Sequence, residues 1–193
     1  MNNKAPAGYG LGANGSAIPG NDLNNAILGG FYVFSSSVQN IPRFQSGKVL
    51  VMPYSNLQYY TQIAFSALTS EIAFRFCNNG VWGPWEYLNP LLSPGVEYRT
   101  AERYNGKPVY AQLVNAGVFP ENGPKAVSHG ISDIDKIVSA NGNLDTVSSL
   151  PYVYGSARQD FMVTTTEIYL TSISPAYTSV NAYITIKYTK TTD

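Results

Sequence analysis

Residues 75–88 read RFCNNGVWGPWEYL and close the first half of the chain. Between residues 71 and 76, Ile and Phe alternate with Glu, Ala and Arg, which is the pattern of a half-buried β-strand. Asn-Asn-Gly at residues 78–80 predicts a turn. A Gly-Pro pair then breaks any regular element and places Trp82 and Trp85 on a short loop. Such large rings either plug the base of a small module or face a ligand, and the plug is the favoured interpretation.

The composition indicates a β-rich recognition protein. The chain has 193 residues, 44% of them hydrophobic, which is enough for real cores in one domain or two small ones. Twelve basic residues balance twelve acidic ones, so the sequence shows no electrostatic footprint for nucleic acid or for an anionic membrane. Tyr is common, at 15 residues, which is typical of sheets whose rings and hydroxyls face partners.

One cysteine, Cys77, excludes a disulfide within the chain and a thiolate metal cluster built by one chain. We expect Cys77 to be a small buried or half-buried residue at the end of a strand. No apolar run approaches the length that crosses a bilayer, and nothing resembles a secretory signal, so no membrane insertion is expected.

The first half is expected to form a small module at residues 21–89, preceded by an extended lead-in at residues 1–20 that is rich in glycine. Asn21 or Asp22 is expected to cap one or two helical turns over residues 23–28. Strands are expected at residues 31–34, 48–52, 58–67 and 71–76. In the alternating segment 58–67, one face should be core and the other should meet solvent or a partner.

The second half is expected to form an antiparallel β-sandwich at residues 95–193, after a short stiff linker at residues 90–94. Asn105-Gly106 supplies the positive φ angles of a tight turn between two strands. Strands are expected at residues 97–100, 107–114, 126–130, 136–140, 161–173 and 181–189. A loop is expected at residues 118–125 and a turn at residues 141–143.

Several stretches of the first half carry a resemblance to a known module. They are DLNNAI at 22–27, GFY at 30–32, NIP at 40–42, GKVLV at 47–51, YTQ at 60–62 and the Trp-x-x-Trp stretch at 75–88. In order and spacing they resemble the pyocin knob domain, which is found in tail fibres of bacteriophages and phage-derived bacteriocins. The resemblance implies a knob-like α+β or β module over residues 21–89.

The second half carries a further resemblance, in the stretches EY at 97–98, YNGKPVY at 104–110, KAVSHGI at 125–131 and AYITIKYTK at 182–190. They resemble the C-terminal head of tail-fibre and baseplate proteins of prophages in Gram-positive bacteria and related phages. The resemblance implies a β-sandwich tip, assembled as a homotrimer, that touches the host surface.

The candidates for catalysis or metal binding are few. The close carboxylate pairs are Asp133 with Asp135 and Glu97 with Glu102, and turn formation explains the first pair better than glycan hydrolysis does. His129 is the one histidine and has no nucleophile motif beside it. Three copies of His129 could meet on a threefold axis and bind an ion, but packing against neighbours is the favoured interpretation. We therefore predict no enzyme, no catalytic residue and no cofactor.

Glycan contacts are the positive hypothesis, because aromatic faces stack on sugars while Asp, Arg and Tyr donate or accept hydrogen bonds. The candidates are Trp82, Trp85, Tyr59, Tyr60 and Tyr87 in the first module and Tyr152, Tyr154, Arg158, Asp160 and Tyr177 in the second. For each tyrosine, half-buried sheet filler is the favoured alternative.

Together these features predict the receptor-binding tip of a phage or phage-derived tail fibre. It would attach the particle to host cell-surface polysaccharide, and its partners would be copies of itself and other tail or fibre proteins. Such a protein belongs to the virion tail, is made in the host bacterial cytoplasm and leaves by lysis. The alternatives are a non-catalytic carbohydrate-binding or spacer module of a glycan-degrading enzyme, and a purely structural trimerising segment.

Overall fold

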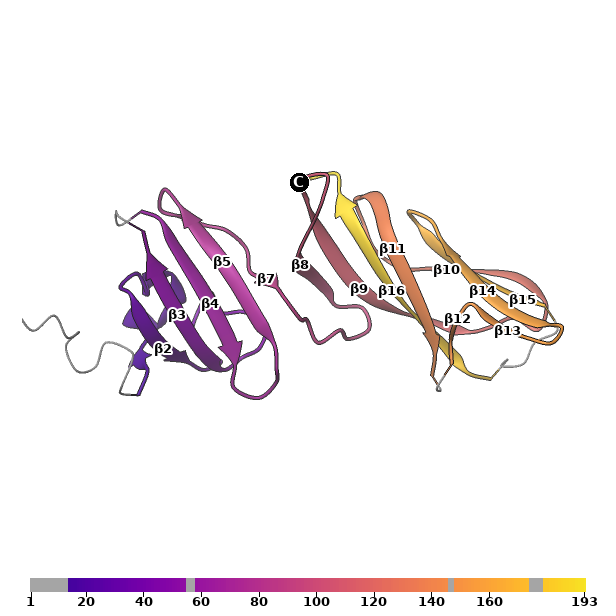
Figure 1. Cartoon of the computed structure of the whole chain (residues 1–193), viewed down its shortest axis with the longest axis horizontal. Helices are drawn as coiled ribbons and strands as arrows, with labels where there is room; N and C mark the ends of the chain where they lie inside the picture. The colour runs from indigo at the N-terminus through magenta and orange to yellow at the C-terminus, as the bar shows by residue number, and fades with distance from the viewer. Residues whose placement is uncertain (1–13, 55–57, 146–147, 174–178) are drawn as a thin grey trace, which may run out of the picture. The chain divides into compact units, whose positions relative to one another are not determined.

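The computed structural model describes residues 14–54, 58–145, 148–173 and 179–193 and is nearly all β (Figure 1). The prediction of a mostly β chain is confirmed. The chain divides into two compact units, Met1–Leu91 and Leu92–Asp193, and each is described by itself. In the described ranges, no helix has the length and apolar character needed to span a membrane.

The first unit is one sheet with two short 3-10 turns. Its elements are β1 (Ser16–Ala17), η1 (Pro19–Asn21), η2 (Leu23–Asn25), β2 (Gly30–Phe34), β3 (Gly47–Pro53), β4 (Tyr60–Ser66), β5 (Ile72–Asn78), β6 (Val81–Trp82) and β7 (Glu86–Tyr87). The strand order is β1-β2-β3-β4-β5-β7, and β6 pairs with β5. The β1–β2 pair is parallel and the others are antiparallel.

Local residue chemistry explains the turns of this unit. Asn79 and Gly80 both have positive φ, as a two-residue hairpin turn between β5 and β6 requires. The one or two helical turns predicted over 23–28 shorten to η2, where the Asp22 carboxylate accepts a hydrogen bond from the Asn24 backbone N–H at 2.9 Å. Trp82 belongs to β6 rather than to the predicted loop, whereas Trp85 lies in the connection from β6 to β7.

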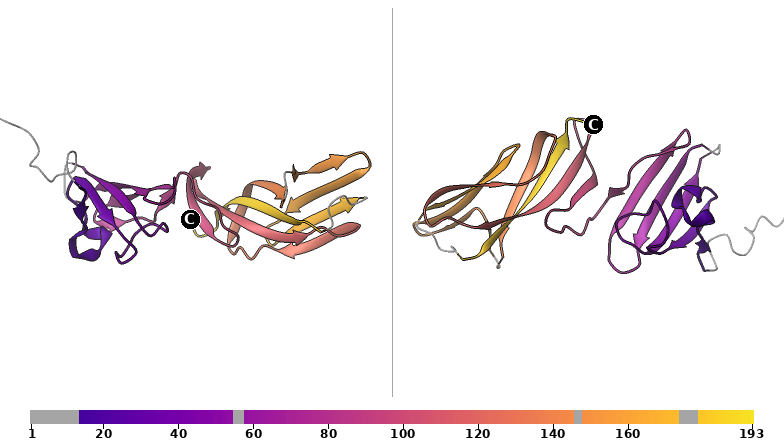
Figure 2. Two further views of the ribbon diagram at one scale, coloured as in Figure 1. Left: turned by 90° about the horizontal axis from the view of Figure 1, so that it is seen from below. Right: turned by 180° about the vertical axis from the view of Figure 1, so that it is seen from behind.

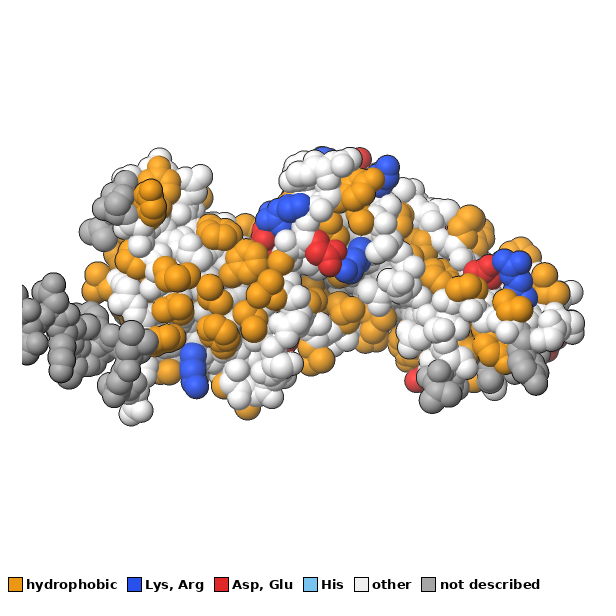
Figure 3. All heavy atoms as spheres, in the orientation of Figure 1, with side chains coloured by type: hydrophobic (Ala, Val, Ile, Leu, Met, Phe, Trp, Pro, Cys, Tyr) orange, Lys and Arg blue, Asp and Glu red, His pale blue; other side chains and the backbone are white. Residues whose placement is uncertain are grey.

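One face of the first sheet is core, and η1 and η2 lie over it (Figure 2). The Gln62 side chain ties the sheet to this cover, because its Nε2 donates to the carbonyls of Leu23 at 2.9 Å and Ala26 at 3.0 Å. Val49 and Val51 are also buried on this side. The opposite face is not covered by these turns, and Figure 3 shows hydrophobic side chains gathered over β3, β4 and β5.

The second unit has two antiparallel sheets. Its elements are β8 (Glu97–Tyr104), β9 (Lys107–Val118), β10 (Gly123–Ser128), β11 (Ile134–Leu144), β12 (Ser149–Leu150), β13 (Tyr152–Tyr154), β14 (Ala157–Val163), β15 (Glu167–Ile173) and β16 (Asn181–Lys190). One sheet has the order β8-β9-β16-β11-β12 and the other β10-β15-β14-β13. Asn105 and Gly106 both have positive φ, so the predicted tight turn between β8 and β9 is confirmed.

The core of the second unit joins the two sheets. Ile184, Ile186 and Tyr188 alternate along β16 and are fully buried in one cluster with Ile168 and Leu170 of β15. Alternating side chains from two facing sheets are the signature of a β-sandwich, so the predicted sandwich is confirmed.

Two predictions for the second unit were wrong. Residues 161–173 are not one strand but parts of β14 and β15, because the Thr164 hydroxyl accepts the Glu167 backbone N–H at 3.0 Å and turns the chain back. Residues 141–143 are not a turn but part of β11. Gly142 leaves room for its neighbours, since a Cβ atom there would lie 2.8 Å from Ile184 Cδ1 and 2.8 Å from Phe161 Cε1 and would displace both side chains.

The predicted loop at 118–125 is shorter than expected. Strand β9 runs to Val118, and β10 begins at Gly123 with Pro124 as its second residue. Because β10 is an edge strand, a proline costs the ladder no central hydrogen bond. Lys125 then donates from Nζ to the Val118 carbonyl at 2.8 Å across the short loop.

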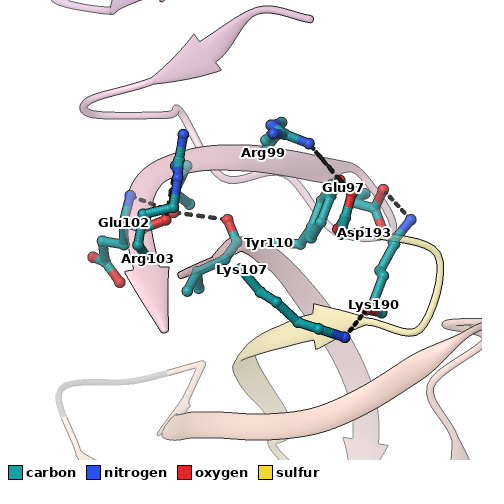
Figure 4. A network of polar contacts seen from close by, with 10 residues as sticks. Glu97, Arg99, Glu102, Arg103, Lys107, Tyr110, Lys190 and Asp193 are labelled. Carbon is teal, nitrogen blue, oxygen red and sulfur yellow. Dashed lines mark hydrogen bonds and ion pairs between the residues drawn. The ribbon is translucent and has the colours of Figure 1, made fainter. Parts of the chain in front are cut away.

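A network of polar contacts holds the C-terminal residues against β8 and β9 (Figure 4). Glu97 accepts hydrogen bonds from the Tyr188 hydroxyl and from Lys190 Nζ, the latter at 2.7 Å. The Tyr110 hydroxyl accepts from Arg99 at 3.0 Å and donates to Asp193 at 3.1 Å. These contacts join β8, β9 and β16 at one end of the sheet.

Candidate functional site

Arg75 is the centre of the cluster that contains both tryptophans. It lies on β5 with 4% of its surface exposed, and its guanidinium carbon is 4.4 Å from the centroid of the Trp82 ring and 4.5 Å from that of Trp85. Burial lowers the pKa of Arg75 to about 10. The cation lies against both indole rings, and its Nε donates a hydrogen bond to Gln62 Oε1 at 2.9 Å.

The two indole N–H groups bind the segments that cover the sheet. Trp82 donates to the Asn24 carbonyl at 3.2 Å, and Trp85 donates to the Asn40 carbonyl at 3.0 Å. The Trp82 ring also stacks on Tyr60 with centroids 5.8 Å apart. These contacts agree with the structural plug favoured by the sequence.

A pocket of about 330 Å³ opens beside this cluster. It is lined by Asn24, Asn40, Ile41, Arg75, Trp82, Gly83, Pro84 and Trp85. Two buried atoms in its wall, Nη2 of Arg75 and Oδ1 of Asn24, have no hydrogen-bond partner among the described residues. The pocket therefore presents two polar atoms that are free to bind a ligand. Its two indole rings, in contrast, already contact other groups of the chain.

Of the three tyrosines predicted as glycan contacts in the first unit, one is exposed and two are buried. Tyr59 is exposed and helps to line an open hollow of about 460 Å³ with Tyr54, Met52, Thr61 and Phe76. Tyr60 is buried under Trp82. Tyr87 is buried too, and its hydroxyl accepts the Arg43 backbone N–H at 2.7 Å. Tyr60 and Tyr87 are therefore mainly core residues, and Tyr60 also lines the hollow beside Tyr59.

In the second unit, the structure brings Arg158 and Asp160 together. Both lie on β14, and Arg158 Nη2 is 2.7 Å from Asp160 Oδ2. They line one pocket of about 250 Å³. The other lining residues are Phe161, Met162, Thr171 and Ile173. The Asp160 Oδ1 atom also accepts the Phe161 backbone N–H at 2.8 Å, which fixes the carboxylate at the pocket wall.

Tyr152 is not among the described residues that line this pocket. Tyr152 is half-buried and packs against the core cluster. The side chain of Tyr154, whose backbone lies in β13, is outside the described residues, as is all of Tyr177. Of the five residues proposed for this unit, Arg158 and Asp160 are the pair that the pocket contains.

His129 is held on both sides of its ring. Its Nδ1 atom accepts the Ile131 backbone N–H at 3.1 Å, and Nε2 lies 3.2 Å from the Thr164 carbonyl. With Nδ1 as acceptor, Nε2 carries the proton and donates, so both nitrogens are occupied within the chain. Over the residues that the structure describes, no three His, Cys, Asp or Glu side chains gather where they could hold a metal ion.

Asp133 takes part in a turn, and Asp135 forms an ion pair. Asp133 has positive φ, as in a turn, and Asp135 lies 2.8 Å from Lys107 Nζ. Hydrogen bonding to Lys107 lowers the pKa of Asp135. Cys77 is buried as expected, and burial raises the pKa of its thiol.

Sequence reasoning missed Arg75 as the residue on which the tryptophan cluster depends. The available signal was a cation in the alternating strand only a few residues before two tryptophans. It also missed the lining residues Met162, Thr171 and Ile173. Their pairing depends on the β14–β15 hairpin, in which Arg158 lies opposite Ile173 and Asp160 opposite Thr171.

Comparisons with protein-family models and with curated proteins find no match. Among solved structures, the chain is similar to an N-truncated R2-type pyocin tail fibre, with 11% identity, a TM-score of 0.32 and coverage of 89% of this chain and 94% of that one. It is similar to a C-terminal fragment of the P. aeruginosa R2 pyocin fibre, with 12% identity, a TM-score of 0.37 and coverage of 94% and 68%. It is also similar to a C-terminal fragment of the P. aeruginosa R1 pyocin fibre, with 12% identity and a TM-score of 0.32. That match covers 90% of this chain and 66% of the fragment.

Proposed function

We propose that this chain is a receptor-binding part of the tail fibre of a phage or phage-derived particle, and that its second unit attaches to host cell-surface polysaccharide. The observation that supports it is the pocket in which Arg158 and Asp160 meet. The two sequence resemblances, to a knob module and to a fibre head, support the same kind of particle.

The chemistry of this pocket suits a sugar. A carboxylate accepts hydrogen bonds from sugar hydroxyls, and a guanidinium donates to sugar oxygens. The Asp160–Arg158 ion pair leaves further donors on Arg158, because a guanidinium has five N–H groups. Met162 and Ile173 add exposed apolar side chains to the same pocket, where they can contact the C–H groups of a sugar ring.

Single sites of this kind bind weakly. A homotrimer would present three copies of the pocket, and a particle with several fibres would present more. Multiple weak contacts raise the effective concentration at the cell surface and convert weak binding into firm attachment. No catalysis is proposed for the chain.

The test is the binding of fluorescently labelled protein to bacterial cells and to an array of bacterial surface polysaccharides. For a glycan that the wild type binds, Arg158→Ala and Asp160→Ala should each weaken binding about tenfold, which corresponds to ~1.4 kcal/mol. The matched control is Asp135→Ala, which removes another exposed ion pair of the same unit, at 2.8 Å from Lys107.

Equal loss in all three variants would contradict a role for this pocket, because it would reflect a general effect on the unit. Failure of the wild type to bind any cell or glycan would instead favour a purely structural segment of the fibre.

A further inference from the structure

The outward face of the β14–β15 hairpin places a threonine directly opposite Asp160. In the register of the two strands, Thr171 pairs with Asp160, and Ile173 pairs with Arg158. Residues paired in this way lie on the same side of a sheet. The residues before and after Thr171 on β15 are fully buried, so the Thr171 side chain points outward, into the pocket that Arg158 and Asp160 line.

The Thr171 hydroxyl is available to a ligand. The side chain is half-buried in the pocket wall. Across the part of the chain that the structure describes, this hydroxyl makes no hydrogen bond with another group. A threonine hydroxyl carries one donor and two acceptor lone pairs. Thr171 therefore adds to the pocket a polar group that the described chain itself does not use.

Asp160 also keeps acceptor capacity. Its Oδ2 atom accepts from the Arg158 guanidinium at 2.7 Å, and its Oδ1 atom accepts from the Phe161 backbone N–H at 2.8 Å. A carboxylate has about four lone-pair sites, so each oxygen can accept one more hydrogen bond. Opposite residues in an antiparallel pair have Cβ atoms about 4.5–5.5 Å apart. The side chains of Asp160 and Thr171 can therefore reach neighbouring atoms of one small ligand.

Apolar side chains flank this polar pair. Along β14, Met162 follows Asp160 on the same face and is 58% exposed. Along β15, Ile173 follows Thr171 on the same face and is 52% exposed. Arg158 balances the charge of Asp160, so the pocket does not require a charged ligand. A sugar ring matches this arrangement, because its hydroxyl groups project from the ring and C–H groups lie between them.

We infer that Asp160 and Thr171 together bind two hydroxyl groups on neighbouring carbon atoms of a sugar ring, and that Thr171 determines which sugars the pocket accepts. Asp160 accepts a hydrogen bond from one hydroxyl, and Thr171 donates to the oxygen of the next. A sugar without the second hydroxyl leaves Thr171 without a partner and binds more weakly. This inference rests on the proposed function, because it concerns the polysaccharide that the second unit binds.

The experiment compares the wild type with Thr171→Val on the array of bacterial surface polysaccharides, over a range of protein concentrations. Valine has the shape of threonine and suits a strand, but it lacks the hydroxyl. On polysaccharides that the wild type binds, Thr171→Val should weaken binding about three- to tenfold. Thr171→Ser keeps the hydroxyl and should stay within about twofold of the wild type. The matched control is Thr185→Val, which changes a half-buried threonine of β16 in the other sheet and should bind as the wild type does.

A second arm treats the same array with periodate, which cleaves the carbon–carbon bond between neighbouring hydroxyl groups. Wild-type binding should be lost on the treated polysaccharides. Circular dichroism reports whether each variant still folds, and Thr171→Ala is the second variant if valine disturbs the hairpin.

The outcomes separate this inference from the proposed function. A wild type that binds no untreated polysaccharide overturns both. If the wild type binds but Thr171→Val binds equally well, or if binding survives periodate, the inference is overturned while the proposed function stands. Equal losses in Thr171→Ser and Thr171→Val also overturn it, because the hydroxyl would then not be the group that contacts the sugar.

Discussion

The Nε atom of Arg75 donates a hydrogen bond to Oε1 of Gln62 over 2.9 Å in the core of the first unit. Gln62 Nε2 in turn donates to the carbonyls of Leu23 and Ala26. These hydrogen bonds connect β5, β4 and the segment at η2 that covers the sheet. The guanidinium plane lies against the rings of Trp82 and Trp85. A buried charge is costly unless it is hydrogen-bonded, so the unit depends on the Gln62 bond and the two indole contacts that Arg75 makes.

Arg75→Lys should destabilise the first unit by about 1–3 kcal/mol. Lysine keeps the charge but loses the planar group that contacts both indoles, and it cannot reproduce the Nε bond to Gln62. Urea unfolding followed by tryptophan fluorescence measures the effect. The control, Arg43→Lys, changes an exposed arginine of the same unit and should cost less than about 0.5 kcal/mol. Equal effects of the two variants would contradict a special role for Arg75.

Gly47→Ala should destabilise the same unit by about 2 kcal/mol or more, because β3 and β4 approach too closely for a side chain. A Cβ atom at Gly47 would lie 2.2 Å from the backbone oxygen of Phe65 and 2.9 Å from Phe34 Cζ. The matched control is Gly83→Ala, whose Cβ would meet nothing closer than 3.4 Å. If both alanine variants unfold at the wild-type urea concentration, the close approach at Gly47 is not a constraint in solution.

Asp22 should make the first unit sensitive to acid. Its carboxylate accepts hydrogen bonds from Asn40 Nδ2 at 2.7 Å and from the Asn24 N–H at 2.9 Å, and these bonds lower its pKa. A lowered pKa in the folded state stabilises the fold above the unfolded value, ~3.9, and this stabilisation is lost as the pH falls through the folded value. Asp22→Asn should therefore be less stable than the wild type at neutral pH and should lose less stability on acidification.

The measurement for Asp22 is urea unfolding between about pH 5 and pH 2, followed by tryptophan fluorescence. Asp22→Ser is a useful second variant, since serine can still accept the Asn24 N–H as a helix cap but does not ionise. A pH dependence that is the same in all three proteins would show that another carboxylate is responsible.

Tyr188 should make the second unit sensitive to alkali. Burial, then the hydrogen bond to Glu97 and the charge of Glu97, raise the pKa of Tyr188. Above about pH 10, the folded state keeps a proton that the unfolded chain releases. The contribution of this hydroxyl to the free energy of unfolding is therefore fully present below about pH 10 and falls as the pH rises above it. Burial also raises the pKa of Tyr110, which acts in the same direction.

Tyr188→Phe should reduce the loss of stability above pH 10 by up to ~1.4 kcal/mol per pH unit, while the variant loses one hydrogen bond at neutral pH. Thermal unfolding by calorimetry between about pH 8 and pH 11.5 measures this difference. If the variant keeps the wild-type slope, the buried tyrosine hydroxyl is not the group that titrates.

Several features could be predicted because they depend on neighbouring residues alone. Alternation over residues 181–189 identified the central strand β16, since a period of two places every second side chain in the core. Asn105-Gly106 identified the turn between β8 and β9, because the two positive φ angles require such residues. Thr164 shows the limit of this reasoning: threonine also suits a strand, and the contact that makes it a turn is a hydroxyl bond to the Glu167 N–H.

The sequence by itself determined that this protein is mostly β, where most strands run and that residues 71–76 have two unlike faces. Only the tertiary structure decided which of those faces is buried. Alternation is symmetric, so the choice depended on distant groups: Gln62 and the two tryptophans contact Arg75 inside, which leaves Phe74 and Phe76 outside. The pocket of Arg158 and Asp160 exists because β15 turns back beside β14 at Thr164, a turn that alternation along residues 161–173 does not reveal.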